Sequence, residues 1–225
     1  MQRYSRNMNT LSPYENDCLK GFKVCVIGCG GLGGYIIEEL GRLGIGTITA
    51  VDGDVFEESN LNRQLLSDMN NLGSSKADAA AKRMSKINPL ITIVPVEQRL
   101  TAENGLAILK GHDVVIDALD NIESRIILER LAEELEIPMV HGAIAGWFGQ
   151  VTTVFPGDRT LSLLYPEGEK HGIEKELGNP SFTPAVIASL QVAETLKVLI
   201  KRGAVLRKRI LVINLLNQEY EIIEL

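Results

Sequence analysis

Short apolar runs rich in β-branched residues alternate along the chain with longer segments whose apolar residues recur at helical spacing. The short runs predict buried strands at residues 23–27, 47–51, 92–96, 114–118 and 139–142. The longer segments predict helices at residues 33–43, 76–88, 101–109, 124–135 and 184–201. Strands that alternate with helices are typical of a mostly parallel sheet joined by right-handed crossovers.

The pattern changes after residue 142, where three further apolar runs predict strands with no helices between neighbours. These runs lie at residues 150–155, 210–215 and 220–225, and the last two could form a hairpin across residues 216–218. Antiparallel strands are commonly added to a parallel sheet. We therefore expect a single α/β domain over residues 1–225, with a Rossmann-like doubly wound, mostly parallel sheet extended by C-terminal antiparallel strands.

Two segments fall outside this pattern. Residues 1–20 begin with a polar stretch that has no apolar reason to pack locally, which predicts an N-terminal arm. Residues 156–182 are rich in glycine, proline and charge, and they are too long for an ordinary connection. We expect them to form a mobile crossover loop with a role in function.

Charge and cysteine content narrow the function classes. The 225-residue chain has a net charge of −6 and no basic block, which argues against a nucleic-acid partner. No apolar run approaches the roughly 20 residues of a membrane helix, so no membrane partner is expected. The three cysteines, Cys18, Cys25 and Cys29, suit a reducing cytoplasm better than a disulfide framework.

A glycine-rich segment joins the first predicted strand to the first long helix. Gly28, Gly30 and Gly33 have the G-x-G-x-x-G spacing. Glycine permits a tight turn and lets phosphate oxygens approach backbone N–H groups at the positive end of a helix. The motif predicts nucleotide binding, but dehydrogenases, flavoenzymes and nucleotide-activating enzymes all use it.

Asp52 ends the second predicted strand, 19 positions after Gly33. In an open α/β sheet this position places a carboxylate beside the ribose of a nucleotide that lies on the glycine turn. The alternative is an aspartate that caps a turn with Gly53.

Two cations follow the same strand. Arg63 lies in Asn60-Leu61-Asn62-Arg63-Gln64, and a guanidinium there could bridge the oxygens of a triphosphate. Lys76 begins a predicted helix and would point its charge toward the same crevice. Its alternative is an exposed helix lysine.

Asp120 comes just after the fourth predicted strand. A carboxylate that meets a triphosphate at this edge would hold Mg²⁺. The alternative is an N-cap for the following helix, a role that Asp120 or Asn121 could serve. Capping and metal binding would need different residues of this pair.

Taken together, these motifs resemble the ThiF/MoeB/HesA adenylyltransferases, which are relatives of the ubiquitin-activating enzymes. The resemblance spans nearly the whole chain, and the order and spacing of its motifs make it specific. The segments that carry it are Arg3-Tyr4-Ser5-Arg6-Asn7, the glycine turn, Val51-Asp52-Gly53-Asp54, Asn60-Leu61-Asn62-Arg63-Gln64, Lys76, Ile87-Asn88-Pro89, Asp117-Ala118-Leu119-Asp120-Asn121 and Gly149-Gln150-Val151.

The resemblance implies roles for the residues of the predicted site. Gly31 would lie under the phosphates of ATP and Asp52 would bind the ribose hydroxyls. The phosphate contacts would be Asn60, Arg63 and Lys76. Asp120 would ligate Mg²⁺. Arg6 matches the second arginine of the family's Arg-Tyr-x-Arg opening, which in relatives reaches the active site of the neighbouring subunit, so a homodimer is implied.

The implied reaction is attack by the C-terminal glycine carboxylate of a carrier protein on the α-phosphate of ATP, giving an acyl adenylate and pyrophosphate. A carboxylate and a triphosphate repel each other, so such a site must gather cations and a metal ion to align them. The carrier would be a small ubiquitin-like sulfur-carrier protein ending in Gly-Gly, of the kind used in thiamine or molybdenum and tungsten cofactor pathways.

Two departures from the family bear on the chemistry. Many relatives hold structural zinc with paired Cys-x-x-Cys motifs, but this chain has no cysteine after Cys29, so structural zinc is not expected. Apolar packing of residues 160–164 could replace it. Some relatives use a downstream cysteine for a covalent intermediate, where this chain offers only Ser181 and Thr183. Cys29 is better interpreted as a small packed residue than as a nucleophile.

Two further residues have open interpretations. His141 ends a predicted parallel strand near the crevice, where it could touch substrate or be a buried, hydrogen-bonded histidine. Trp147 precedes a predicted strand, where an exposed aromatic side chain could grip a peptide tail. Core packing is the favoured interpretation for Trp147.

Three functions remain in competition. The leading one is an ATP-dependent adenylyltransferase that acts on a sulfur carrier. An NAD-dependent dehydrogenase would share the glycine turn and Asp52, but it gives no account of Arg6, Arg63, Lys76 and Asp120. A non-catalytic carrier-binding module with the same fold would explain the missing cysteines, although the nucleotide-binding residues are all present.

Overall fold

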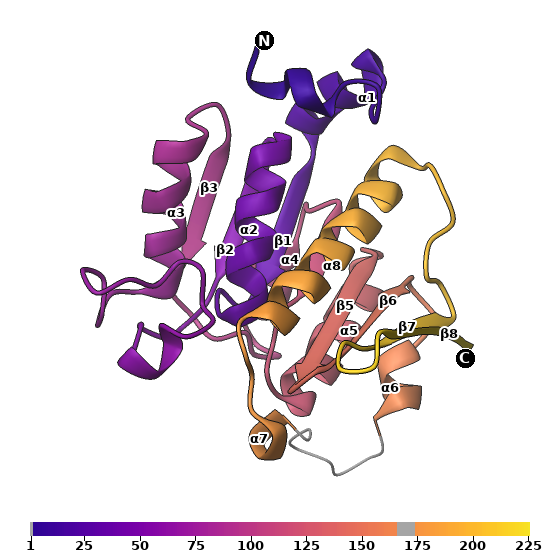
Figure 1. The fold of residues 1–225 in the computed structure, drawn as a ribbon. Coiled ribbons are helices and arrows are strands. Elements are labelled where there is room, and N and C mark those ends of the chain that lie inside the picture. Colours follow the sequence, from indigo (N-terminus) through magenta and orange to yellow (C-terminus); the bar gives the residue numbers. More distant parts are fainter. Residues whose placement is uncertain (1, 166–173) are drawn as a thin grey trace.

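A computed structural model describes residues 2–165 and 174–225 of the chain. Eight strands form one sheet in the order β3-β2-β1-β4-β5-β6-β7-β8 (Figure 1). Their bounds are β1 Lys23–Ile27, β2 Thr47–Val51, β3 Thr92–Val96, β4 Val114–Asp117, β5 Met139–Ala145, β6 Phe148–Val154, β7 Arg209–Asn214 and β8 Glu219–Glu224. The first five strands are parallel, and the last three are antiparallel to their neighbours. The predicted fold class and the C-terminal hairpin are confirmed.

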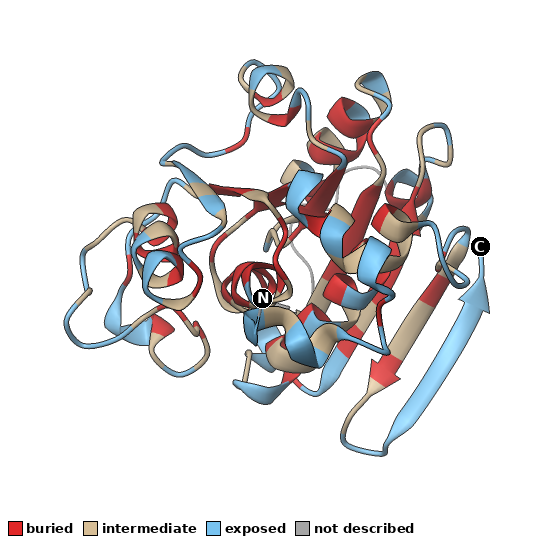
Figure 2. Ribbon diagram, turned by 90° about the horizontal axis from the view of Figure 1, so that it is seen from above, coloured by how far each residue is buried: buried red, intermediate tan, exposed pale blue. Residues whose placement is uncertain are grey.

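Helices cover both faces of the sheet. One face packs against α2, α3 and α8, and the other against α4, α5 and α6. Their bounds are α2 Gly31–Leu43, α3 Lys76–Ile87, α4 Gly105–Leu109, α5 Ile122–Glu134, α6 Thr160–Leu164 and α8 Phe182–Ile200. Alternation along β1 feeds two cores, because Val24 and Val26 point to the first face while Cys25 and Ile27 point to the second. Buried residues accordingly concentrate in the sheet and on the inner sides of the helices (Figure 2).

The helix α8 has the composition of a membrane span, with 19 residues and a mean hydropathy of 1.3. Our expectation that no apolar run reaches such a length is therefore wrong. In this fold, however, α8 packs against α2 and β5, and half of its apolar stretch is buried. The helix is apolar because it covers the sheet.

Several predicted elements differ in their bounds or burial. The strand β3 is largely exposed because it forms an edge of the sheet, where Pro95 is tolerated. The helix predicted at residues 101–109 is only one turn and a half long, since Thr101 and Asn104 form a hydrogen-bonded turn before it. β5 continues to Ala145 and pairs with β6 through a tight turn at Gly146.

The N-terminal arm packs locally, contrary to our expectation. It contains the 3₁₀ helix η1 (Gln2–Asn7) and the helix α1 (Pro13–Cys18). The Tyr4 hydroxyl accepts a hydrogen bond of 2.8 Å from Asn88, and its ring lies over Gly44. These polar and aromatic contacts hold the start of the arm at the C-terminal ends of α2 and α3, and Leu11 and Leu19 anchor its later part in the core.

The crossover segment over residues 156–182 has structure of its own where it is described. It contains α6 and the short helix α7 (Glu174–Leu177), and residues 166–173 lie outside the described part of the chain. The buried carboxylate of Glu129 accepts hydrogen bonds from the backbone N–H groups of Leu161 (2.6 Å) and Ser162 (3.0 Å). Leu161 packs into the core, whereas Leu163 is exposed, so the predicted apolar packing accounts for only part of this anchor.

Candidate functional site

A cavity of about 610 Å³ opens at the carboxyl edge of the parallel strands. This is the edge at which open α/β sheets bind ligands. The cavity is lined by the glycine turn and by residues that follow β2, β3 and β4. Its lining includes Gly28, Gly30, Gly31, Asp52, Asp54, Arg63, Gln64, Lys76, Arg99, Asp120, Asn121, Arg125, Ile144 and Asn179. Most of the residues that we predicted for the site therefore meet here, with Gly33, Asn60 and Arg6 as the exceptions.

The glycine turn can adopt its conformation only because its glycines have no side chains. Gly28 has a φ of +99°, and a Cβ there would lie 2.5 Å from the carbonyl oxygen of Ala118. A Cβ on Gly33 would lie 1.8 Å from the carbonyl oxygen of Gly28, so Gly33 permits close packing of α2 on β1 and does not line the cavity. Gly30 is the N-cap of α2 and provides no side-chain cap, so the first N–H groups of the helix are available to an anion at the cavity.

Asp52 faces the cavity with both of its oxygens anchored. One oxygen accepts the N–H of Cys29 and the other the N–H of Asp54, each at 2.8 Å. These bonds combine the two interpretations, since the carboxylate caps a turn and also lies in the cavity. An ionised carboxylate has further lone pairs, which could accept ribose hydroxyls.

Cys29 is fully buried, and burial raises the pKa of its thiol well above the usual range. A thiol in this environment stays protonated near neutral pH and is a poor nucleophile. The structure therefore supports the interpretation of Cys29 as a packed residue.

Lys76 is only 8% exposed, so the exposed-lysine interpretation is wrong. Its ammonium lies 3.5 Å from Asp54, whose other oxygen accepts a hydrogen bond of 2.7 Å from Arg99. Burial alone would raise the pKa of Asp54, but the Arg99 hydrogen bond and the Lys76 charge outweigh it and lower the pKa. Asp54 thus stays ionised and holds both cations at the cavity.

Arg63 and Asn60 have separate positions. The Arg63 guanidinium donates to the carbonyl of Ser59 (2.9 Å) and to Asn62 (2.8 Å), and it lines the cavity. Asn60 is buried and its side-chain oxygen accepts the N–H of Glu57. Asn60 therefore shapes the turn that presents Arg63, and its side chain does not line the cavity.

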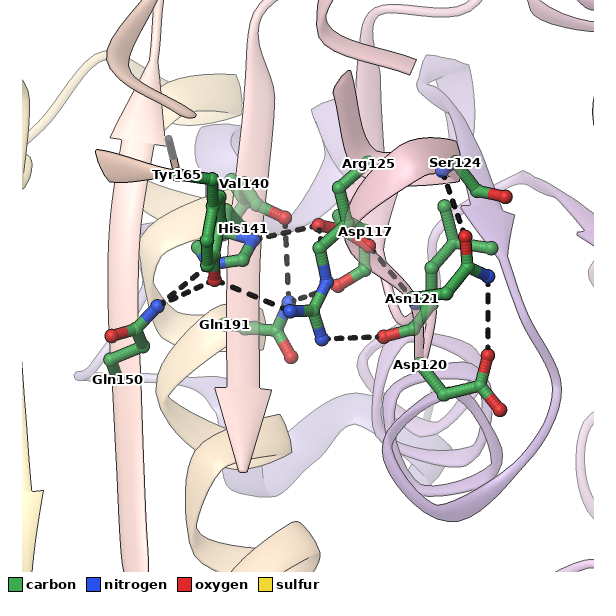
Figure 3. A network of polar contacts seen from close by, with 11 residues as sticks. Asp117, Asp120, Asn121, Ser124, Arg125, Val140, His141, Gln150, Tyr165 and Gln191 are labelled. Carbon is green, nitrogen blue, oxygen red and sulfur yellow. Dashed lines mark hydrogen bonds and ion pairs between the residues drawn. The ribbon is translucent and has the colours of Figure 1, made fainter. Parts of the chain in front are cut away.

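Of the pair Asp120 and Asn121, it is Asn121 that caps the helix. Asn121 is the N-cap of α5 and accepts the N–H of Ser124 at 2.8 Å, as Figure 3 shows. This leaves the carboxylate of Asp120 beside the cavity, in contact with the Asn121 amide at 3.3 Å.

A single exposed carboxylate fits Mg²⁺ that arrives with a triphosphate, because Mg²⁺ typically takes one or two protein carboxylates plus phosphate oxygens and waters. Across residues 2–165 and 174–225 there is no cluster of three or more His, Cys, Asp or Glu side chains that could hold a metal ion without such a ligand. The donor set thus favours a metal ion shared with a nucleotide.

A buried polar network lies behind Asp120 (Figure 3). His141 is fully buried and its Nδ1 lies 2.7 Å from the Asp117 carboxylate. Burial lowers the pKa of His141 despite the opposing effect of Asp117, so the imidazole is neutral near pH 7. His141 is thus the buried, hydrogen-bonded histidine of our two interpretations. Arg125 joins the same network. We did not predict Arg125 or Arg99 as site residues, because neither belongs to a recognisable motif in the sequence.

Arg6 lies in η1, beside the C-terminal end of α2, and it is exposed. The cavity is at the other end of α2, whose 13 residues span about 20 Å at 1.5 Å per residue. Arg6 therefore does not meet the cavity of its own chain.

Trp147 is 43% exposed and stacks on Phe182, with the ring centroids 4.4 Å apart. Our expectation of core packing is wrong for this residue. Trp147 lies in the β5–β6 turn, where its ring meets the first residue of α8 and remains partly exposed.

A family model described as the ThiF family matches residues 4–225. The chain belongs to the ThiF family. It is 34% identical over 226 residues to the SAMP-activating enzyme E1 of Haloferax volcanii, covering 98% of this chain and 84% of that protein. It is 35% identical over 231 residues to the sulfur carrier protein adenylyltransferase of Thermus thermophilus, covering 98% and 85%.

Two solved structures of other proteins have the same fold as this chain. E. coli MccB with ATP superposes with a TM-score of 0.80 at 22% identity, covering 99% of this chain and 70% of that chain. The E. coli tRNA N6-threonylcarbamoyladenosine dehydratase TcdA superposes with a TM-score of 0.75 at 24% identity, covering 89% and 95%. These similarities place the ThiF-family chain in a fold that accommodates ATP in at least one relative.

Proposed function

We propose that this chain is an ATP-dependent adenylyltransferase that activates the C-terminal glycine carboxylate of a small ubiquitin-like sulfur-carrier protein. The observation that carries the proposal is the convergence of Asp52, Arg63, Lys76 and Asp120 on one cavity at the N-terminus of α2. The names of the Haloferax and Thermus relatives support this choice of reaction and substrate. The sulfur carrier is expected to end in Gly-Gly.

The chain's own residues provide what this reaction needs. The N–H groups at the start of α2 and the cations Arg63 and Lys76 would bind the triphosphate and offset its charge. The repulsion between the triphosphate and an approaching carboxylate would then be reduced. Asp52 would fix the ribose and with it the position of the α-phosphate. Asp120 would hold Mg²⁺, which when bound adds positive charge at the leaving pyrophosphate.

The site is proposed to be completed by a second copy of the chain. Arg6 lies in η1, at the end of the sheet opposite to its own cavity, so it could act only at the cavity of another subunit. We therefore propose a homodimer in which Arg6 of one protomer meets the nucleotide of its partner. We also propose a cytoplasmic location, which the free cysteines Cys18, Cys25 and Cys29 support.

Two other functions are weaker on this geometry. A dehydrogenase has no use for the Lys76–Asp54–Arg99 cluster beside Arg63, because a dinucleotide carries no triphosphate. A non-catalytic module would have no need for Asp120 to be left free at the cavity while Asn121 caps the helix.

The test is exchange of labelled pyrophosphate into ATP, measured with each small protein ending in Gly-Gly from the same genome. We expect exchange with one such carrier, and none when its terminal glycine is deleted. Asp120→Ala should abolish exchange, whereas Glu123→Ala, an exposed change in the first turn of α5, should not. No exchange with any carrier, or full exchange by Asp120→Ala, would refute the proposal.

A further inference from the structure

The loop that carries Asp120 joins β4 to α5. Both backbone polar groups of Leu119 in this loop make hydrogen bonds to side chains. The Leu119 N–H donates to the Asp117 carboxylate at 2.9 Å, and its carbonyl accepts a hydrogen bond of 2.7 Å from Arg125 Nη2 (Figure 3). Leu119 immediately precedes Asp120 in the chain. These two bonds therefore fix the direction in which the Asp120 side chain leaves the backbone toward the cavity.

Two of the three guanidinium nitrogens of Arg125 donate hydrogen bonds to protein oxygens, whereas the buried Nε makes none. Besides the Leu119 bond, Nη1 donates to the Tyr165 hydroxyl at 3.2 Å, and Nε lies 3.7 Å from the Asp117 carboxylate. The side chain is only 7% exposed, although it lines the cavity. Arg63, in contrast, donates from one nitrogen to groups of its own turn. Arg125 is thus committed to the protein and not to a phosphate.

The Tyr165 hydroxyl connects Arg125 to residues of β5 and β6. It accepts a hydrogen bond of 2.8 Å from Gln150 on β6 and lies 3.3 Å from Nε2 of His141 on β5. Because Nδ1 of the neutral His141 donates to Asp117, its Nε2 is an acceptor for the tyrosine proton. The bonds close a ring that starts and ends at Asp117, and members of such a buried network reinforce one another.

We propose that Arg125 is the positioning residue of the metal site, and that Tyr165 acts through it. The guanidinium holds the Leu119 carbonyl so that the Asp120 carboxylate is aimed at the cation of the bound nucleotide. The inference rests on the proposed function, because that function places Mg²⁺ at Asp120. It adds that metal affinity is set by contacts that reach α6 and β6, far from the phosphates.

The experiment measures metal binding without turnover. Wild-type and variant chains are loaded with an ATP analogue whose α,β-bridging oxygen is a methylene group, and Mn²⁺ affinity is measured by electron paramagnetic resonance. Arg125→Lys keeps the charge but cannot bridge three partners, so we expect Mn²⁺ affinity to fall about tenfold, the lower end for residues that orient a metal ligand. Tyr165→Phe removes only the hydroxyl and should give a smaller loss in the same direction.

Two comparisons separate positioning from other roles. Binding of the analogue in EDTA should be unchanged in both variants, since neither removes a phosphate contact. Arg130→Lys, an exposed change on the same helix, should leave Mn²⁺ affinity at the wild-type value. If Arg125→Lys does not fold, Tyr165→Phe decides alone.

The inference is overturned if Tyr165→Phe and every folded Arg125 variant bind Mn²⁺ as the wild type does. It is also overturned if Arg125→Lys loses nucleotide affinity equally in EDTA, because Arg125 would then be a phosphate ligand. A wild-type chain that binds Mn²⁺ with the analogue but gives no carrier-dependent exchange would refute the proposed function and leave the positioning role standing.

Discussion

The three aspartates at the cavity differ in what already binds them. Asp52 accepts two backbone N–H groups, Asp54 holds Lys76 and Arg99, and Asp120 accepts a side-chain hydrogen bond from the Asn121 amide. A carboxylate with fixed partners orients a ligand, whereas one with few partners has oxygens to give to a cation. Their neighbours therefore separate these three identical side chains into distinct roles.

Asp52→Asn tests the ribose contact. The new side-chain NH2 group at position 52 would face a backbone N–H that donates to a carboxylate oxygen in the wild type. The remaining side-chain oxygen is uncharged, so its hydrogen bond to the ribose would be weaker. We expect ATP affinity to fall by about 1.5–3 kcal/mol, the range for hydrogen bonds to charged groups, as measured by calorimetry. In wild type, 2′-deoxy-ATP should bind more weakly than ATP, and in Asp52→Asn this difference should shrink. An equal 2′-deoxy penalty in both proteins would contradict the assignment.

The buried state of Cys29 predicts that no covalent bond forms between enzyme and carrier. After incubation with ATP and carrier, intact mass spectrometry under non-reducing conditions should show only unmodified enzyme. Ser181 and Thr183 have high hydroxyl pKa values and no paired histidine among the described residues, so neither should replace a thiolate. An adduct that thiols cleave, and that disappears in Cys29→Ser, would show that the thiol does reach the adenylate.

The sequence predicts the cavity residues that follow strands, because position at a strand end is read directly from the chain. It does not predict side chains whose partners lie far away in sequence. Arg99 meets Asp54 across 45 positions, and Arg125 meets Tyr165 across 40. The family resemblance implies a phosphate contact for Asn60, whereas its side chain bonds to Glu57 and does not line the cavity.

At the scale of elements, the strands and long helices follow from apolar periodicity, and the sequence predicts them within a few residues. The segments fixed by polar contacts do not follow from it. The anchor of α6 is Glu129, a residue 32 positions before Leu161, and the start of the N-terminal arm is held through Tyr4 and Asn88. Neither contact leaves a pattern in the local sequence.

An ion pair between Arg207 and Asp158 joins the loop before β7 to the segment before α6. Arg207 donates two hydrogen bonds to Asp158, at 2.8 and 2.9 Å, and lies over the ring of Phe155. The Arg207 hydrogen bonds, backed by the Phe155 N–H, lower the pKa of Asp158 against the effect of burial. Fork-like pairs of this kind are the strong form of surface ion pair.

Asp158→Asn should therefore lower the free energy of unfolding, by about 1 kcal/mol once the exposure of Arg207 is discounted. Because the pKa of Asp158 is lower in the folded chain, the contribution is present above its unfolded pKa of about 3.9 and is lost as pH falls through the folded value. Urea unfolding of both proteins should be measured from pH 7 to pH 3. The difference in free energy of unfolding between wild type and Asp158→Asn should become smaller at the acid end of this range. An advantage that is constant with pH would contradict the ion-pair account.

At the scale of the whole molecule, the N-terminal arm lies at the end of the sheet opposite to the carboxyl ends of the parallel strands (Figure 1), and the residues that line the cavity follow those carboxyl ends. A site that uses both Asp120 and Arg6 therefore needs two copies of the chain. Isologous dimers would give two such composite sites, each with residues from both protomers.

Complementation tests this arrangement. Arg6→Ala and Asp120→Ala homodimers should each lack exchange activity, while a mixture of the two should regain about a quarter of wild-type activity, because random pairing leaves one composite site intact in half of the dimers. Subunit exchange is confirmed with differently tagged chains. If the tagged chains exchange and no activity returns, Arg6 does not act across the interface.

We propose that the cavity transfers the adenylyl group of ATP to a carrier carboxylate. This transfer is tested by the intact mass of the carrier after brief incubation with the enzyme, ATP, Mg²⁺ and pyrophosphatase, quenched in acid to preserve the mixed anhydride. We predict a carrier heavier by one adenylyl group, absent with Asp120→Ala and absent when the carrier lacks its terminal glycine. A carrier that activates pyrophosphate exchange yet never gains the adenylyl group, or a cavity that binds NAD in preference to ATP, would contradict the account.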